Sequence, residues 1–585
     1  MQYKPRNLIY AQKILNDWLR LIATIFFHVR DWIQSISIQT RVTSLIIMMA
    51  TLIRVFLLAS GWPLLDGDQG TMGLAALHIF HGTDYPIFFY GQTFMGTIEA
   101  YIAALMFHIF GISTFSLRIG LLFFYVGFLI NMFLFIRKLF SANFAVFTIL
   151  LLALGAPEIV YWQLSSRVYP EIPFFASSLL LIAVHLALKR EQQYSITQQR
   201  RHFLQKDLWF YGMWGFIAGF SIYDDPLIIP FVVITGFILL ICLYRRKVII
   251  NYIVIIVTFL IGISPIFIYT VLHPSSSVFQ VGASAFSSFS SSSTSLFTLN
   301  RLKILAVQSV HTVLISIPVM TGGNTLCPTG EVDNLGGYDP ASETCIGIHA
   351  LWGVFTTALL LFAGYSYLRN IFKRQNSQTV LCASILREIC RFASILGMIM
   401  TILLLMLSSH PYTIMTPWKT SRYLIAFEVV MPCMLYSFWE ISCNNRYFQL
   451  VKRFSRVSIL IIVCIYSIGM LLTFKGVQNA QATLLRDEDL ISTLQRRGIV
   501  HIYTIHGPCN GLTFLSQETI LCNIADDPFH PSGNSYIPDG VVVEHDPKTV
   551  YIYPVGSPQS HILLHSTAKK LTHSIIDGYD IFTNA

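Results

Sequence analysis

The sequence predicts an all-α polytopic membrane protein with about eleven spans, helices at the outer interface, and a small C-terminal extracytoplasmic α/β domain. Of the 585 residues, 54% are hydrophobic and 12% are charged, whereas soluble globular domains carry about 25% charged residues. Apolar runs long enough to cross a bilayer recur along the chain. The net charge of +9 comes from short basic clusters between these runs. Such clusters are typical of orientation signals and give no indication of nucleic-acid binding.

Residues 1–41 are predicted to form a cytoplasmic amphipathic segment that lies on the membrane face. Basic residues are spread through an apolar pattern: Lys4, Arg6, Lys13, Arg20, Arg30 and Arg41. A cleavable signal would have a compact apolar core before a small-residue site, and this segment does not.

A transmembrane domain is expected over residues 42–475. Its predicted spans are the apolar segments 44–60, 115–136, 143–157, 172–188, 208–223, 226–243, 249–271, 347–368, 385–408, 423–441 and 456–474. With the N-terminus inside, the basic clusters fall in the inner loops and the acidic residues in the outer loops, as the positive-inside rule requires. The C-terminus is then extracytoplasmic. A bacterial cell membrane is the expected location, because no eukaryotic sorting motif is present.

Two further apolar stretches, 98–112 and 303–320, are expected to lie at the outer interface. Polar residues interrupt both of them. They belong to the first outer loop (61–114), which would carry juxtamembrane helices, and to a large outer loop (274–346). If both stretches crossed, the count would be about thirteen spans, and the charge rule would fail in the middle of the chain.

The polar tail, residues 476–585, is predicted to be the extracytoplasmic domain. A helix is expected over 481–497, with strands over 499–505, 540–544 and 549–553. Outside the membrane, two neighbouring cysteine pairs, Cys327 with Cys345 and Cys509 with Cys522, are suited to disulfides.

The first outer loop begins with two acids, Asp66 and Asp68. Keeping two carboxylates beside the membrane costs free energy, so the pair is expected to have a function. We expect Asp68 to act as a general base that removes a proton from an attacking hydroxyl, with Asp66 as the second candidate. The alternative is that Asp68 caps the helix that begins near Thr71.

An anionic substrate would need cations on the outer side, and arginine suits a phosphate because its planar fork matches two oxygens. Arg422 is the strongest candidate, since Lys419 and Tyr423 lie beside it. Its alternative role is a helix-end anchor that reaches the headgroups. The other outer cations are Arg118, Arg167, Arg301 and Lys303. Glu99 is expected to bind sugar or acceptor hydroxyls, or else to favour a helix N-terminus.

Several motifs together resemble the GT-C superfamily of membrane glycosyltransferases, nearest to its family-39 and aminoarabinose-transferase-like group. The resemblance covers about residues 40–475. It rests on Asp68-Gln69 past the first span, Phe89-Tyr90-Gly91-Gln92, Gly96 with Glu99, Phe110-Gly111-Ile112-Ser113 leading to Leu117-Arg118, Gly215 to Pro226, Gly262 to Pro265, and Ser421-Arg422-Tyr423-Leu424.

The resemblance implies inverting transfer of a sugar from a polyprenyl-phosphate donor to a lipid, glycan or protein acceptor on the outer face. It implies that the juxtamembrane helices form the floor of the active site, with substrate-binding residues that include Tyr90, Gln92, Arg118 and Glu171. Gln69 replaces the Glu that is commoner in this motif. A metal site is therefore less expected there; no cofactor is predicted to be required, and a divalent metal stays open.

Two other functions compete with glycosyl transfer. One is a transporter or flippase of a lipid-linked saccharide or another solute; the other is a non-catalytic assembly protein of the cell envelope. Transporters tend to have internal repeats and charges near the bilayer centre. No convincing repeat is present here, and the polar groups gather at one face, which favours chemistry at the surface.

Overall fold

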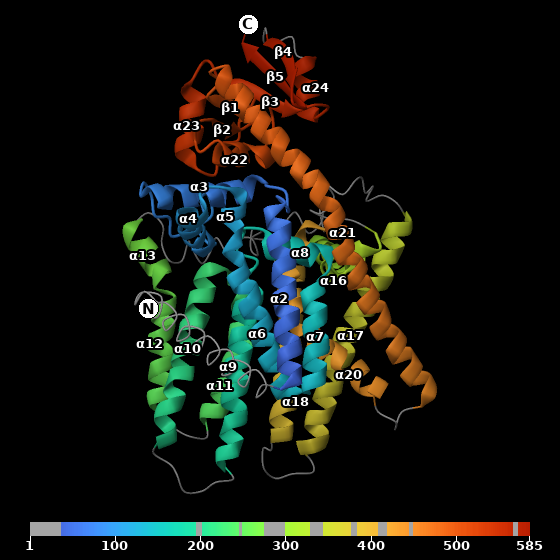
Figure 1. Ribbon diagram of the computed structural model, residues 1–585. Coiled ribbons are helices and arrows are strands. Elements are labelled where there is room, and N and C mark those ends of the chain that lie inside the picture. Colours follow the sequence, from blue (N-terminus) through green and yellow to red (C-terminus); the bar gives the residue numbers. More distant parts are fainter. Residues whose placement is uncertain are drawn as a thin grey trace, which may run out of the picture.

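The computed structural model describes residues 37–194, 202–244, 249–273, 299–327, 343–375, 383–407, 418–443, 448–565 and 571–584. These residues form three layers (Figure 1): a helical bundle, a layer of short helices across one end of it, and an α/β domain above that layer. Most of the predicted N-terminal segment 1–41 and of the large outer loop 274–346 lies outside the described residues.

The bundle forms because long apolar helices bury their shared faces against one another and leave apolar side chains outside for lipid. Its helices are α2 (Ile38–Ala59), α6 (Leu121–Leu139), α7 (Ala142–Leu154), α9 (Glu171–Tyr194), α10 (His202–Asp224), α11 (Ile229–Tyr244), α12 (Ile249–Gly262), α13 (Ser264–Leu272), α17 (Glu343–Gln375), α18 (Ala383–Leu407), α20 (Phe427–Cys443) and α21 (Gln449–Arg496).

A helix occupies each of the eleven segments predicted to span. By length and apolar composition, seven helices among the described residues can cross a membrane, or up to nine if each of two bent pairs is one span. The bent pairs are α7 with α8 (Pro157–Leu164), at 75°, and α12 with α13, at 44°. This count is lower than the predicted eleven, and by length and composition it includes Leu302–Thr321, the stretch that was expected to lie at the interface. The protein is an integral membrane protein by either count.

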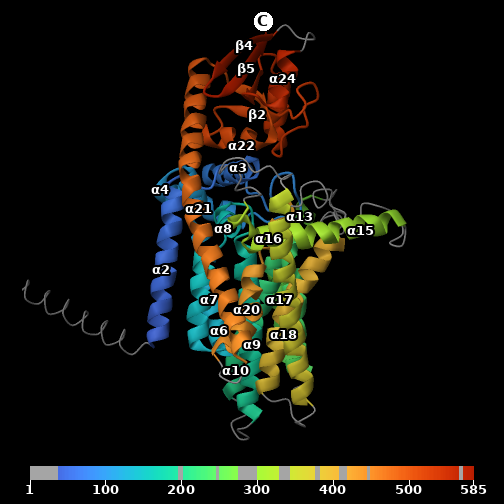
Figure 2. The same ribbon diagram turned by 90° about the vertical axis from the view of Figure 1, so that its right-hand side faces the viewer.

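The layer at one end of the bundle contains the segments expected at the interface. Helix α4 (Ile98–Phe110) has 13 residues and therefore extends about 20 Å, less than the roughly 30 Å of a hydrocarbon core. Helix α15 (Leu299–His311) lies across the axes of the bundle helices (Figure 2). The remaining short helices are α3 (Gly67–His81), α5 (Thr114–Ile119), η1 (Pro226–Ile228), η2 (Thr312–Ser316), α16 (Ile317–Thr321), η3 (Gly323–Thr325) and η5 (Lys419–Leu424).

Helix α21 joins the bundle to the α/β domain (Figure 1). Its 48 residues run without a break from Gln449 to Arg496 and extend about 70 Å. The predicted helix 481–497 is thus the last part of one long rod. Such a rod fixes where the domain stands above the bundle.

The α/β domain has a five-stranded sheet in the order β2-β1-β3-β5-β4. Strand β1 pairs in parallel with β2 and β3, and β5 pairs antiparallel with β3 and β4. The elements are β1 (His501–Thr504), α22 (His506–Leu515), β2 (Leu521–Ile524), α23 (Ile537–His545), β3 (Val550–Pro554), α24 (Pro558–Leu564), β4 (Leu571–Ile576) and β5 (Tyr579–Asn584).

The strand predicted over 540–544 is wrong, because these residues belong to helix α23. Gly540 and Val543 are buried, whereas Val541 and Val542 are each 47% exposed. One face therefore recurs every three residues, as in a helix, and tertiary packing overrides the β-propensity of three valines. The strands predicted over 499–505 and 549–553 correspond to β1 and β3. Both predicted cysteine pairs are disulfide-bonded.

Candidate functional site

Asp66 caps helix α3. Its backbone is extended, and its side chain accepts hydrogen bonds from the backbone N–H and the side-chain amide of Gln69, both at 3.0 Å. The capping role considered for Asp68 thus belongs to Asp66, which satisfies donors that a helix start leaves unpaired. Asp68, two residues later, lies in the first turn, and its side chain is not needed to cap the helix.

Arg167 holds both acids from the turn between α8 and α9. Its Nε donates to Asp66 Oδ1 at 3.1 Å, its Nη2 forms an ion pair with Asp66 Oδ2, and its Nη1 lies 3.6 Å from Asp68 Oδ2. The Tyr161 hydroxyl donates to Asp66 Oδ2 at 3.2 Å. The sequence did not predict that Arg167 contacts the acids, and Arg167 was named there as one of several outer cations.

Asp68 is the more accessible acid, with 31% of its side chain exposed. His506 Nε2 of the α/β domain lies 3.4 Å from Asp68 Oδ1. Burial acts to raise the pKa of Asp68, but the hydrogen bond and charge of His506, with the charges of Arg422 and Lys419, outweigh it, so the pKa is lowered. Asp68 is therefore ionised at neutral pH.

Arg422, in η5, lies among aromatic rings. Its guanidinium carbon is 5.8 Å from the ring centres of Trp162 and Tyr169 and 5.3 Å from that of Tyr423. One terminal N–H donates to the Tyr423 hydroxyl at 3.4 Å, and among the described residues its buried Nε has no hydrogen-bond partner. Lys419, on the same short helix, is exposed. Arg167 also lies 5.3 Å from the Trp162 ring centre, so Arg422 is at the same end of the bundle as the acids that Arg167 contacts.

Glu99 is buried, 1% exposed, and holds the turn that carries Arg167. It accepts hydrogen bonds from the Ser166 hydroxyl and from the backbone N–H of Val168, both at 2.9 Å. Burial raises the pKa of Glu99 to about 7. Glu171 is fully buried beside it. The structure thus brings these two predicted substrate-binding acids together beneath the turn, without exposing either.

Arg118 is also buried, at 1% exposure. It donates to Gln69 Oε1 at 2.9 Å and to the carbonyls of Pro63 and Leu64 at 2.7 and 3.3 Å. With its donors engaged in this way, Arg118 fixes the loop that leads to Asp66 and does not present its charge to a phosphate. The expectation of a direct substrate contact does not fit this geometry.

Tyr90 lies at the far end of α3 from Asp68. Its hydroxyl is 2.8 Å from both Asp84 Oδ2 and His78 Nδ1, and its ring centre is 4.7 Å from that of Tyr536. Gln92 is half-buried in the neighbouring turn, where its backbone N–H donates to Phe89. These two predicted residues are therefore separate from the cluster around Asp68.

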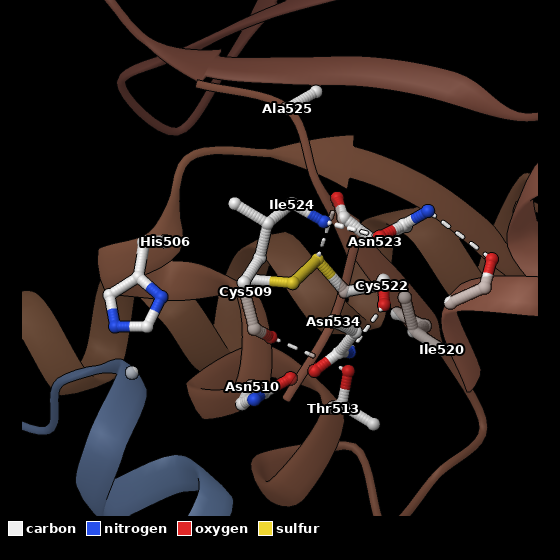
Figure 3. The surroundings of a disulfide bond; sticks show 12 residues. His506, Cys509, Asn510, Thr513, Ile520, Cys522, Asn523, Ile524, Ala525 and Asn534 are labelled. Carbon is white, nitrogen blue, oxygen red and sulfur yellow. Dashed lines mark hydrogen bonds between the residues drawn. A yellow bond between two sulfur atoms is a disulfide. The ribbon is translucent and has the colours of Figure 1, made fainter. Parts of the chain in front are cut away.

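Helix α22 of the α/β domain packs directly on α3. Glycines 67, 70 and 73 of α3 face it, and a Cβ atom at any of them would clash with His506, Asn510 or Phe514. The Asn510 amide donates to the Thr71 hydroxyl at 2.7 Å. Figure 3 shows His506 above the blue ribbon, which has the colour of the first outer loop, and the Cys509–Cys522 disulfide to the right of His506. His506 was not among the residues predicted for the site, although a glycine at every third position of α3 was the available signal for a closely packed partner.

No family model and no curated protein matches the sequence. Among solved structures, ArnT from Cupriavidus metallidurans bound to undecaprenyl phosphate is similar, with a TM-score of 0.54 and 12% identity over 93% of this chain and 98% of that one. An oligosaccharyltransferase from Archaeoglobus fulgidus, in complex with Zn and sulfate, aligns with a TM-score of 0.47 and 12% identity over 92% of this chain and 73% of that one. The likeness to ArnT shows that the chain has the same fold as that protein.

Proposed function

We propose that the protein transfers a sugar from a polyprenyl-phosphate-linked donor to an acceptor hydroxyl or similar group, at the membrane face that carries the α/β domain. The observation that supports this most is the cluster at the start of α3, where Arg167 pairs with Asp66 and lies 3.6 Å from Asp68, while Arg167 and Arg422 both lie over the Trp162 ring. A solved structure of this fold holds undecaprenyl phosphate. The acceptor would be a lipid, a glycan or a protein, and the face would be the outer side of a bacterial cell membrane.

In this reaction Asp68 takes the proton of the acceptor hydroxyl as its oxygen attacks the anomeric carbon. The bond from that carbon to the phosphate oxygen breaks on the opposite side, so the configuration inverts. The leaving polyprenyl phosphate gains the negative charge. Arg422 is suited to stabilise it because its fork can donate to two phosphate oxygens.

Donor binding would also make Asp68 a better base. The positive charges of Arg422 and Lys419 contribute to the lowered pKa of Asp68. A bound phosphate would neutralise part of that charge, and the pKa of Asp68 would rise toward its ordinary value. Proton transfer to Asp68 is thereby favoured when the donor is in place.

A metal ion does not fit the acid pair as it stands. The Arg167 guanidinium contacts both Asp66 and Asp68, so one cation already neutralises part of the charge that would attract a metal ion. Within the described ranges, no group of three or more His, Cys, Asp or Glu side chains could hold a metal.

The test is transfer by purified protein in lipid, with a polyprenyl-phosphate sugar and candidate acceptors. Asp68→Asn should reduce transfer by roughly 10²- to 10⁴-fold, the usual contribution of a general base. Asp577→Asn is the matched control, since Asp577 is exposed in the α/β domain and Asn tolerates its left-handed backbone.

Full transfer by Asp68→Asn would show that another group is the base. If the wild-type protein never consumes donor but moves a lipid-linked saccharide across the membrane, the transporter alternative replaces this proposal.

A further inference from the structure

A second polar site lies at the end of the bundle opposite the α/β domain, where α17 ends and α18 begins (Figure 1). Between these ends and α20 is a cavity of about 230 Å³, against roughly 30 Å³ for one water molecule. Its walls are polar and include Asn370 and Ser384 along with three arginines. The proposed reaction does not use this site.

Positive charge exceeds negative charge in the cavity. Arg374, Arg387 and Arg391 line it together with two acids, Glu388 and Glu440. A polar pocket with three guanidinium groups at the end of a membrane helix is suited to an anion.

The three arginines differ in how many hydrogen bonds and ion pairs they already form within the protein. Arg391 donates to Glu388 Oε1 at 2.9 Å and to the carbonyl of Leu139, and it lies 4.3 Å from the Phe140 ring centre. It is part of the fixed wall. Arg374 lies 3.7 Å from the same Glu388 oxygen and is 44% exposed. Arg387 is exposed and, among the described residues, has no hydrogen-bond or ion-pair partner, so two guanidinium groups are available to a ligand.

The end of α17 that lines the cavity lies at the lipid boundary. Tyr365 and Phe372, on the face of this helix away from Asn370 and Arg374, are 63% and 60% exposed. Phosphate in the headgroup layer is the anion that two arginine forks bind best at this depth. We propose that this cavity binds a phosphate group, with an anionic lipid headgroup as its source.

Native mass spectrometry of the delipidated full-length protein tests the proposal. Phosphatidylglycerol and phosphatidylcholine are added in turn, and the bound lipid is counted at each concentration. The wild-type protein should prefer phosphatidylglycerol, and Arg374→Gln with Arg387→Gln should weaken that binding about thirtyfold, the usual effect of two arginines at a membrane surface. The matched control is Arg369→Gln with Arg453→Gln, two exposed cations that do not line the cavity.

A titration with inorganic phosphate, followed by calorimetry, separates the two sources of the group. If free phosphate binds, this binding depends on Arg387, and the protein shows no preference between the two lipids, then the cavity is a phosphate site but its ligand is not a lipid headgroup. Equal lipid binding by the cavity and control variants, without phosphate binding, would overturn the site itself. If the double variant fails to fold, Ser384→Leu, which fills the cavity without a change of charge, should give the same loss.

Discussion

One guanidinium group, that of Arg167, organises the acids at the start of α3. It pairs with Asp66, which is already the cap of the helix, and reaches Asp68 at 3.6 Å. Below it, the buried Glu99 holds the turn of residues 166–168 in place. The accessible acid therefore stands on a prearranged support, which limits the reorganisation needed during a reaction.

Arg422 allows a direct test of phosphate binding at the candidate site. Arg422→Gln should weaken binding of the polyprenyl-phosphate donor by about ten- to a hundredfold, because charged hydrogen bonds contribute roughly 1.5–3 kcal/mol. Arg422→Lys should recover part of this loss, since lysine keeps the charge but lacks the fork. Donor affinity is measured directly, with Arg497→Gln, an exposed cation at the C-cap of α21, as the control. Unchanged donor affinity in Arg422→Gln would show that the phosphate group binds at a place other than Arg422.

At the scale of elements, α3 is packed on both sides. Its apolar residues contact Ala100, Ala103 and Phe107 of α4, and also Phe514 of α22. A helix between two layers is buried around most of its circumference, as α3 is. The position of Asp68 therefore depends on how closely α22 approaches.

Gly70→Ala tests that approach. The new Cβ would collide with the backbone of Asn510 and Gly511, which cannot rotate away. We expect the contact between the α/β domain and α3 to lose about 1–3 kcal/mol, as in other overpacked sites. Hydrogen exchange of α22 measures the loss. Gly507→Ala, where nothing lies within 4 Å of the added atom, should leave exchange unchanged or slower, and equal exchange in both variants would contradict the packing argument.

The pair of His506 and Asp68 should make the same contact pH-dependent. The hydrogen bond to Asp68 raises the pKa of His506, and Asp526 adds to this, while burial and Arg167 oppose it. The stabilisation is thus present below the unfolded pKa of about 6.5 and is lost as pH rises through the raised value. Since the pKa of Asp68 is lowered, the stabilisation also disappears as pH falls through that value.

Hydrogen exchange of α22 across pH 5 to 9 checks this dependence. Protection in the wild-type protein should decrease as pH rises, by at most about 1 kcal/mol because His506 is half exposed. His506→Gln should show no such decrease. A matching decrease in both proteins would assign it to another group.

For the whole molecule, the long helix α21 and the packing on α3 hold the α/β domain above the acids (Figure 2). The Cys509–Cys522 disulfide joins α22 to β2 within that domain. The helix that supplies His506 is thereby tied to the sheet.

Removing this disulfide should destabilise the domain. The cysteines are 13 positions apart in the sequence, so Cys509→Ala with Cys522→Ala should cost about 3 kcal/mol. Limited proteolysis should then cut the α/β domain at lower temperature while the bundle stays intact. Cys464→Ala, an exposed free cysteine on α21, is the control. Equal resistance in both variants would mean that packing on α3 alone holds the domain.

Hydropathy along the chain was sufficient to locate the helices of the bundle, and polar interruptions marked α4 and α15 as different from them. These features are local, because the cost of placing a segment in lipid depends on the side chains of that segment alone. The acid-bearing loop and both disulfide pairs could be predicted for the same reason: their residues are close in sequence.

The tertiary structure decided which of the candidate residues meet. Arg118 is buried in the loop before α3, and Arg167 contacts the two acids. His506, from the C-terminal domain, lies beside Asp68. Residues 540–544 form a helix. Each of these outcomes depends on pairing between distant segments, and a charge or a β-branched run does not encode its partner. The residue types needed for chemistry could thus be read from the sequence, but their arrangement followed from packing between layers.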